Sequence, residues 1–191
     1  MNARVLTSRA GRSPRASRRP GFTLVEVIAT IAIISVIGSI ASRTIITALN
    51  GYTTSATRAQ LHSELSIAMD RIDRELKRIP QKASYGSIAP NITSVTGTSI
   101  AWNGNYSLSL SGTQLQMVDN GAATTVLLDN VTSFSIQAYN ESNTALSATL
   151  SGTACDPIRR VVVQITIQRS GITETLRTKV FLRGTMRGAS T

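Results

Sequence analysis

The sequence of 191 residues contains a single cysteine, Cys155, and a single histidine, His62. One cysteine excludes an internal disulfide and any metal site that needs several cysteines. His62 has no second histidine or cysteine at ligand spacing, so we interpret it as a solvent-facing helix residue and not as a metal ligand. Cys155 lies in the polar stretch GTACDPIRR, where we expect a loop thiol without a chemical role.

Motifs that mark catalysis or phosphate binding are also missing. The sequence has no GxSxG motif, and no glycine-rich phosphate loop follows a predicted strand. Three aspartates (Asp119, Asp129 and Asp156) are scattered beside turns or strand ends, where capping or turn formation is the expected role and calcium binding the alternative. The sequence therefore predicts a protein that is not an enzyme and that holds no cofactor and no catalytic or metal site.

Acidic residues are absent from the first 21 positions, although the chain as a whole is strongly basic. The net charge is +10 and the sequence pI is about 11.0, values that could indicate a nucleic-acid partner. Six of the 20 basic residues precede Phe22, which leaves 14 basic against 10 acidic side chains, a net charge of +4. The basicity belongs to a leader of residues 1–21, and we expect no nucleic acid as a partner.

A long apolar run follows the leader, from Phe22 to Ala41, with one carboxylate, Glu26, near its start. Twenty helical residues span about 30 Å, one hydrocarbon thickness. Carboxylates are rare in such spans because each costs about 2.5–3.5 kcal/mol on insertion scales. A secretory signal cleaved after Ser39-Ile40-Ala41, a twin-arginine signal and a mitochondrial transit peptide are alternatives. None of these three explains Glu26.

The stretch GFTLVEVIATIAIISVIGSIA, preceded by basic residues, resembles the class III signal of type IV pilins and type II secretion pseudopilins. The resemblance implies that a prepilin peptidase cuts between Gly21 and Phe22 and that the new amino group of Phe22 is methylated. It also implies a glutamate as the fifth residue of the mature chain, and counting from Phe22 the fifth residue is Glu26. In a packed filament, Glu26 of one subunit would pair with the Phe22 amine of a neighbour, which assigns Glu26 to assembly.

The helical pattern continues over residues 42–79 with an apolar stripe at spacings of three and four, formed by Leu61, Leu65, Ala68, Met69, Ile72, Leu76 and Ile79. Pro80 ends the pattern. Asn50-Gly51 predicts a kink or a partly melted turn. We therefore expect one long helix over residues 22–79, with a transmembrane half at 22–41 and an amphipathic half at 42–79.

Residues 80–191 are expected to form a β-rich head. Short alternating runs (TSIAW, YSLSLS, TQLQMV and TTVLLD) are joined by turn sequences, and longer strands are predicted at 131–139, 158–168 and 172–182. NESNTALSATLSGTACDP reads as a long polar loop, and Arg159-Arg160 as an exposed charged edge or, alternatively, a partner contact. The fold class is α+β, a pilin-like fold in which the amphipathic half-helix packs on an antiparallel sheet.

The order of strand and loop over LLDNVTSFSIQAYN and IRRVVVQITI is similar to J-type minor pseudopilins and W-type minor pilins. The resemblance implies a minor subunit, held in the bacterial inner membrane by one span with its head in the periplasm, that assembles into or primes a type IV pilus or a type II secretion pseudopilus. Its partners would be the prepilin peptidase, other minor pilins or pseudopilins and the major pilin. The alternative is a secreted or periplasmic β-rich binding domain, released by ordinary signal peptidase near Ala41.

Overall fold

The computed structural model describes residues 21–83 and 88–185. Its longest element is the helix α1, Leu24–Lys77, with 54 residues. The chain divides into two compact units, and the boundary between Ala48 and Leu49 falls inside this helix. The second part of α1 therefore belongs to the same unit as the strands, as the amphipathic pattern predicts.

The partly melted turn predicted as one possibility at Asn50-Gly51 is absent, because both residues are helical. A glycine inside a helix costs only about 1 kcal/mol relative to alanine, and the long helix on either side outweighs that cost. The helix ends at Lys77, three residues before Pro80, and two basic side chains, Arg74 and Lys77, lie in its last turn. Basic residues there interact favourably with the negative end of the helix dipole.

The apolar stripe of α1 is buried, as its spacing predicts. Leu61, Leu65 and Leu76 are completely buried, and Ile72 is 1% exposed. Ile67, between them in sequence, is 69% exposed on the opposite side of the helix. The stripe belongs to one hydrophobic core that also contains residues from the strands.

The strands form two antiparallel sheets, whereas the sequence pattern predicted one. The first has six strands in the order β5-β4-β3-β2-β1-β7, and the second has three in the order β6-β8-β9. The bounds of the first sheet are β1 Ile92–Val95, β2 Ser99–Trp102, β3 Tyr106–Ser111, β4 Gln114–Val118, β5 Thr125–Leu128 and β7 Leu150–Ser151. The second contains β6 Val131–Tyr139, β8 Arg160–Arg169 and β9 Ile172–Phe181, and the short helices are η1 Gly152–Cys155 and η2 Arg183–Thr185.

The hairpins fall where the turn residues predict them. Asn103 and Gly104 have φ angles of 50° and 74° between β2 and β3, and Ser170 and Gly171 have 53° and 78° between β8 and β9. Ser170 and Gly171 form a two-residue loop between the paired residues Arg169 and Ile172, whereas Asn103 and Gly104 belong to a three-residue loop between Trp102 and Tyr106. Positive φ angles at such positions favour glycine and asparagine. The three long strands of the second sheet also lie within two residues of their predicted bounds.

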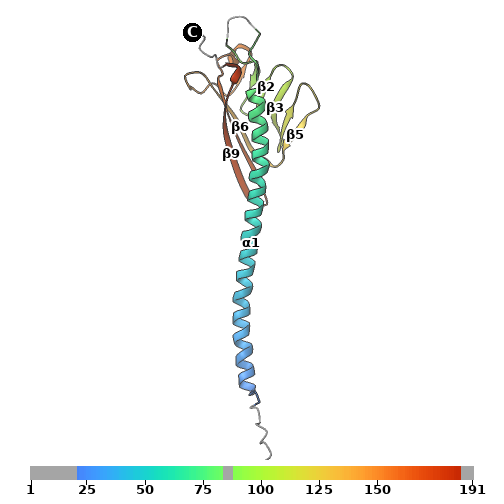
Figure 1. Cartoon of the computed structure of the whole chain (residues 1–191), viewed down its shortest axis with the longest axis vertical. Coiled ribbons are helices and arrows are strands. Elements are labelled where there is room, and N and C mark those ends of the chain that lie inside the picture. The colour runs from blue at the N-terminus through green and yellow to red at the C-terminus, as the bar shows by residue number, and fades with distance from the viewer. Residues whose placement is uncertain (1–20, 84–87, 186–191) are drawn as a thin grey trace, which may run out of the picture. The chain divides into compact units, whose positions relative to one another are not determined.

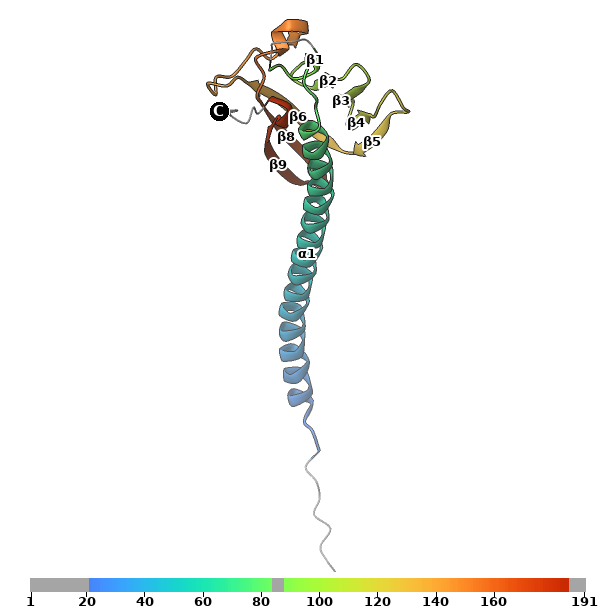
Figure 2. The same cartoon turned by 45° about the horizontal axis from the view of Figure 1, so that its top comes forward.

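Both sheets share their core with the second part of α1. The core contains Leu65 of α1, Ile100 and Met117 of the six-stranded sheet, and Val163 and Ile165 of the three-stranded sheet. In Figure 1 the strands β6 and β9 lie on one side of this part of α1, and β2, β3 and β5 lie on the other. Figure 2 shows the same arrangement from a second direction. The result is the expected α+β pilin-like architecture, a long N-terminal helix followed by an antiparallel β head.

The segment predicted as a long polar loop, residues 140–157, is partly ordered. It contributes β7 to the edge of the six-stranded sheet and contains the short helix η1. Cys155, at the end of η1, is completely buried and belongs to the core, so the expectation of a loop thiol is wrong. Burial raises the pKa of the Cys155 thiol above its ordinary value, which keeps the thiol protonated and unreactive.

Candidate processing and assembly site

The proposed cleavage point, the peptide bond between Gly21 and Phe22, lies in an exposed segment without regular structure directly before α1. Phe22 is 80% exposed. A Cβ atom at Gly21 would meet no heavy atom within 4 Å, so no described residue crowds the backbone at this position. Exposed, irregular backbone of this kind is where peptidases cut most readily.

The start of α1 is fixed by Thr23, a residue that the sequence reasoning did not single out. The Thr23 Oγ1 atom accepts a hydrogen bond from the backbone N–H of Glu26 at 3.3 Å, and the Thr23 carbonyl accepts one from the N–H of Val27 at 3.2 Å. Threonine at the N-cap with glutamate three residues later is the sequence signature of a capping box. That spacing in Thr23-Leu24-Val25-Glu26 could have identified the helix start from the sequence alone.

Glu26 lies in the first turn of α1 with its side chain exposed. A carboxylate at this end is stabilised by the positive end of the helix dipole. No ion pair among residues 21–83 and 88–185 includes Glu26. Within the chain that the structure describes, its carboxylate is therefore available to a partner.

The apolar half of α1 exposes almost every side chain that it carries. An 18-residue window has a mean hydropathy of 2.4, and none of that window is buried against the rest of the chain. The side chains of Ile28, Ile34 and Ile40 are each at least 60% exposed. Contiguous apolar surface of this extent marks a membrane or protein contact, and by length and composition the helix is a candidate membrane span.

The three scattered aspartates do not converge on a metal site. Asp129 accepts a hydrogen bond from the Gln114 side chain at 2.8 Å, and Asp156 forms an ion pair with Lys82. A lysine ammonium next to Asp156 opposes the binding of a cation there. The residues that the structure describes include no group of three or more histidine, cysteine, aspartate or glutamate side chains placed to hold a metal ion.

His62 is exposed on α1, as predicted, and its Nδ1 atom lies 3.2 Å from a carboxylate oxygen of Glu174 in β9. The dipeptide Arg159-Arg160 is not an exposed edge. Arg160 begins β8, the central strand of its sheet, and both arginines are half-buried. The prediction of an exposed charged edge is therefore wrong, because strand order cannot be read from a local pattern.

A second link between α1 and the strands is the ion pair of Glu64 and Arg169. The two guanidinium nitrogens Nη1 and Nη2 lie 3.0 and 2.9 Å from the two carboxylate oxygens, a bidentate geometry. The hydrogen bonds from Arg169 hold the pKa of Glu64 below its ordinary value. The link joins the helix to the end of β8 within one compact unit.

This pair predicts a small, pH-dependent contribution to stability. Because the folded-state pKa of Glu64 is depressed, its contribution is present above the unfolded-state pKa, about 4.3, and is lost as the pH falls through the folded-state pKa. Glu64→Gln should therefore unfold at lower urea concentration than the parent at neutral pH, and the two midpoints should converge as the pH falls through the depressed folded-state pKa of Glu64. Asp119→Asn, a change at an exposed residue outside any ion pair of the described chain, should leave the neutral-pH midpoint unchanged. A Glu64→Gln midpoint equal to that of the parent at neutral pH would show that the pair stabilises nothing.

Residues 16–42 match the family model of the prokaryotic N-terminal methylation motif, and this range contains Gly21, Phe22, Thr23 and Glu26. No curated protein matches the chain. The match supports a signal of the type IV pilin and pseudopilin kind, and such a signal implies processing by prepilin peptidase and assembly with other pilins. Together, the motif and the apolar helix fit a membrane-anchored pilin.

Proposed function

We infer that this chain is a minor subunit of a type IV pilus or of a type II secretion pseudopilus, and that it has a structural and not an enzymatic role. The observation that carries this proposal is the match of residues 16–42 to the methylation motif, with Glu26 as the fifth residue when Phe22 is counted as the first. The apolar half of α1, exposed along its length, supplies the surface that a filament core or a bilayer would cover. Its place would be the bacterial inner membrane, with the head in the periplasm, and then the filament.

Processing would create the group that Glu26 needs. Once the bond after Gly21 is cut, Phe22 begins the chain and carries a positive amine that prepilin peptidase then methylates. In the filament, the Glu26 carboxylate of one subunit would pair with the Phe22 amine of a neighbour inside an apolar environment. A charge pair removed from water interacts much more strongly than an exposed pair, so this contact would favour assembly and set the axial register between subunits.

Two features favour a minor over a major subunit. Major pilins commonly close a receptor-binding loop with a pair of cysteines, whereas Cys155 is the only cysteine of the sequence and is buried in the core. The order of strand and loop read from the sequence over residues 127–140 and 158–167, which resembles that of J-type minor pseudopilins and W-type minor pilins, also supports this proposal. The partners would be the prepilin peptidase, other minor subunits and the major pilin.

The rival proposal is a binding domain released by signal peptidase after Ala41. In the structure, residues 39–42 lie inside α1, which continues to Lys77. Peptidases cut exposed irregular backbone much more readily than the interior of a helix, so this position is a poor substrate. The irregular segment at Gly21 and Phe22 is the better one.

Cleavage at Gly21 can be tested by adding bulk at that position. Gly21→Leu should leave the leader attached, because the peptidase must approach the backbone of the scissile bond closely. The measurement is the size of the protein in cells that contain the prepilin peptidase. Gly11→Leu, the same change inside the leader, should be processed as the parent is. Normal processing of Gly21→Leu would contradict the proposed site.

A further inference from the structure

Three side chains on neighbouring strands of the three-stranded sheet form a cluster that the proposed function does not use. Tyr139 of β6, Arg160 of β8 and Phe181 of β9 lie directly opposite one another in the strand register. The Arg160 Cζ atom lies 4.3 Å from the centre of the Tyr139 ring and 5.8 Å from that of the Phe181 ring. Attraction between a cation and aromatic rings at these distances holds the guanidinium in a fixed position.

The donors of Arg160 are not matched by the described part of the chain. Its Nε atom is buried and has no hydrogen-bond partner, and none of the ion pairs formed by residues 21–83 and 88–185 includes Arg160. A guanidinium presents five N–H donors and no acceptor, and a buried donor without a partner is unfavourable. The aromatic rings therefore hold Arg160 in place, and its Nη1 and Nη2 donors, which form no hydrogen bond within the described chain, are the ones left for a ligand.

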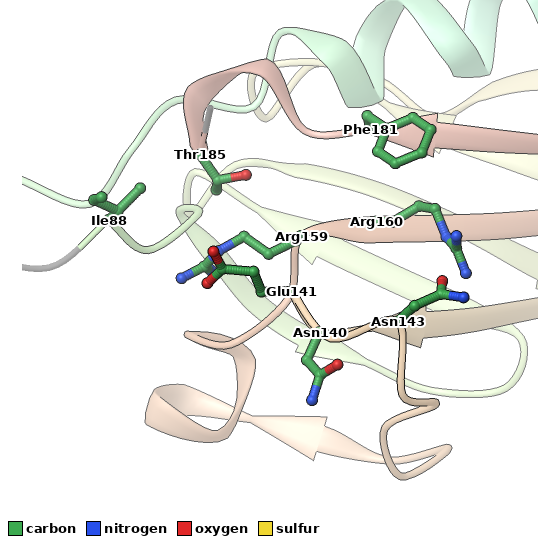
Figure 3. Close-up of a pocket in the computed structure, with 8 residues that line it drawn as sticks. All are labelled: Ile88, Asn140, Glu141, Asn143, Arg159, Arg160, Phe181 and Thr185. Atoms are coloured by element: carbon green, nitrogen blue, oxygen red, sulfur yellow. The ribbon is translucent and has the colours of Figure 1, made fainter. Parts of the chain in front are cut away.

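Arg160 lines a cavity of about 550 Å³ at this end of the sheet. The other walls include Arg159 of the same chain segment, Asn143 and Glu141 of the loop after β6, and Phe181. In Figure 3 the Arg160 side chain lies beside Asn143, whereas Glu141 lies on the side of Arg159. Phe181 is 49% exposed and gives the cavity an apolar wall.

The two arginines of the cavity differ in what they already bind. The Arg159 Nη1 atom donates to the backbone carbonyl oxygens of Asp156 and Ile158, at 2.7 and 3.0 Å. Arg160 has no such contacts in the described chain, so it is the donor that a ligand would meet. Among the described residues that line the cavity, Glu141 is the one acidic side chain, so two guanidinium groups and one carboxylate give this wall a net charge of +1.

We propose that this cavity binds a carboxylate side chain, an aspartate or a glutamate, of a partner polypeptide. The planar fork of a guanidinium matches a carboxylate in a bidentate geometry, and the aromatic rings orient the Arg160 fork before the ligand arrives. A net charge of +1 balances a single carboxylate better than a phosphate group, which carries about −1.5 to −2 at neutral pH. The exposed Phe181 ring suits an apolar side chain next to the acidic one. The assignment to a polypeptide rests on the proposed function, in which the head meets other subunits.

The test uses the full chain, ¹⁵N-labelled in detergent micelles, and follows the Nε–Hε resonance of Arg160 by NMR. This resonance is assigned to Arg160 because it is missing from the spectrum of the Arg160→Lys variant. The probe is the peptide acetyl-Gly-Phe-Glu-Gly-amide, and its control has glutamine in place of glutamate. The glutamate peptide should shift the resonance in a saturable way, whereas the glutamine peptide should not.

Variants separate the guanidinium fork from its charge. Arg160→Lys keeps the positive charge but loses the bidentate geometry, so the glutamate peptide should bind roughly tenfold more weakly to this variant. Because the variant lacks the Nε–Hε resonance, its binding is measured from the backbone resonances of residues that line the cavity. Arg177→Lys, at an exposed arginine of β9 outside the cavity, should bind as the parent does. A cooperative thermal unfolding transition for each variant shows that the variant is folded. The comparison of the glutamate and glutamine peptides uses the parent chain alone, so it does not depend on the folding of any variant.

No shift with the glutamate peptide, or equal shifts with both peptides, would overturn the proposal. Displacement of the peptide by an equal concentration of inorganic phosphate would also overturn it, because the site would then recognise any anion. Peptide binding does not depend on cleavage at Gly21. If the glutamate peptide binds but the prepilin peptidase does not process the chain, the binding site is supported and the pilin function is refuted. If the chain is processed but the peptide does not bind, the pilin function is supported and the binding site is refuted.

Discussion

Replacing Glu26 with valine should remove most of the protein from filaments while its amount in the membrane stays at the parental level. The carboxylate costs about 2.5–3.5 kcal/mol in an apolar span, so Glu26→Val should insert at least as well as the parent. Filament assembly should suffer because the Phe22 amine of a neighbouring subunit would be buried without its partner. Leaving one member of a buried charge pair unmatched costs about 3–5 kcal/mol, enough to reduce incorporation by two orders of magnitude or more.

The measurement compares membrane fractions and sheared filaments by immunoblot, together with cross-linking to neighbouring pilins. Thr30→Val is the matched control, since it removes a polar group one turn along the same helix. The Thr30 hydroxyl bonds only to the carbonyl of Val27 within the described chain, so its loss should leave assembly intact. Normal incorporation and normal cross-links for Glu26→Val would contradict the proposed pairing.

Replacing Leu65 with alanine should destabilise the head by about 2–5 kcal/mol, because the side chain is completely buried between α1 and the strands. That loss is a large part of the total stability of a typical domain, about 5–15 kcal/mol. Urea unfolding of the full chain in detergent, followed by the fluorescence of the single tryptophan, Trp102, measures it. Trp102 lies in β2 and is 3% exposed, so its emission reports on the core.

Ile67→Ala is the matched control on the same helix. Its side chain is 69% exposed, so the change should alter the free energy of unfolding by less than about 0.5 kcal/mol. Equal losses for the two variants would mean that the apolar stripe does not pack on the strands of its own head. A larger loss for Ile67→Ala would mean that the two faces of the helix are exchanged.

The sequence predicts well what local signals encode. The spacing of Leu61, Leu65, Ile72 and Leu76 identifies the buried stripe, because an α-helix brings residues three and four apart onto one face. Turn residues with positive φ identify the hairpins, since Asn-Gly and Ser-Gly pairs favour that conformation. The N-terminal motif is likewise contiguous, and the family match covers the same stretch.

Features that depend on contacts between distant segments were not predictable in this way. β1 pairs with β7, which lies more than fifty residues away, so the division into two sheets leaves no local pattern. The burial of Cys155 also depends on that distant pairing, and its polar neighbours in sequence suggested a loop. The half-buried position of Arg160 is not predictable for the same reason, because only the strand order shows that β8 is central. By contrast, the N-cap role of Thr23 is predictable from the sequence, because Thr23 precedes Glu26 by three residues, as in a capping box.

The first residue of the mature protein tests the central proposal most directly. The measurement is intact mass and N-terminal sequencing of the chain purified from membranes of cells that contain the prepilin peptidase. The proposal predicts a chain that begins with N-methyl-Phe22 and retains the whole of α1. A chain that begins at Ser42 would contradict it and would favour a domain released by signal peptidase.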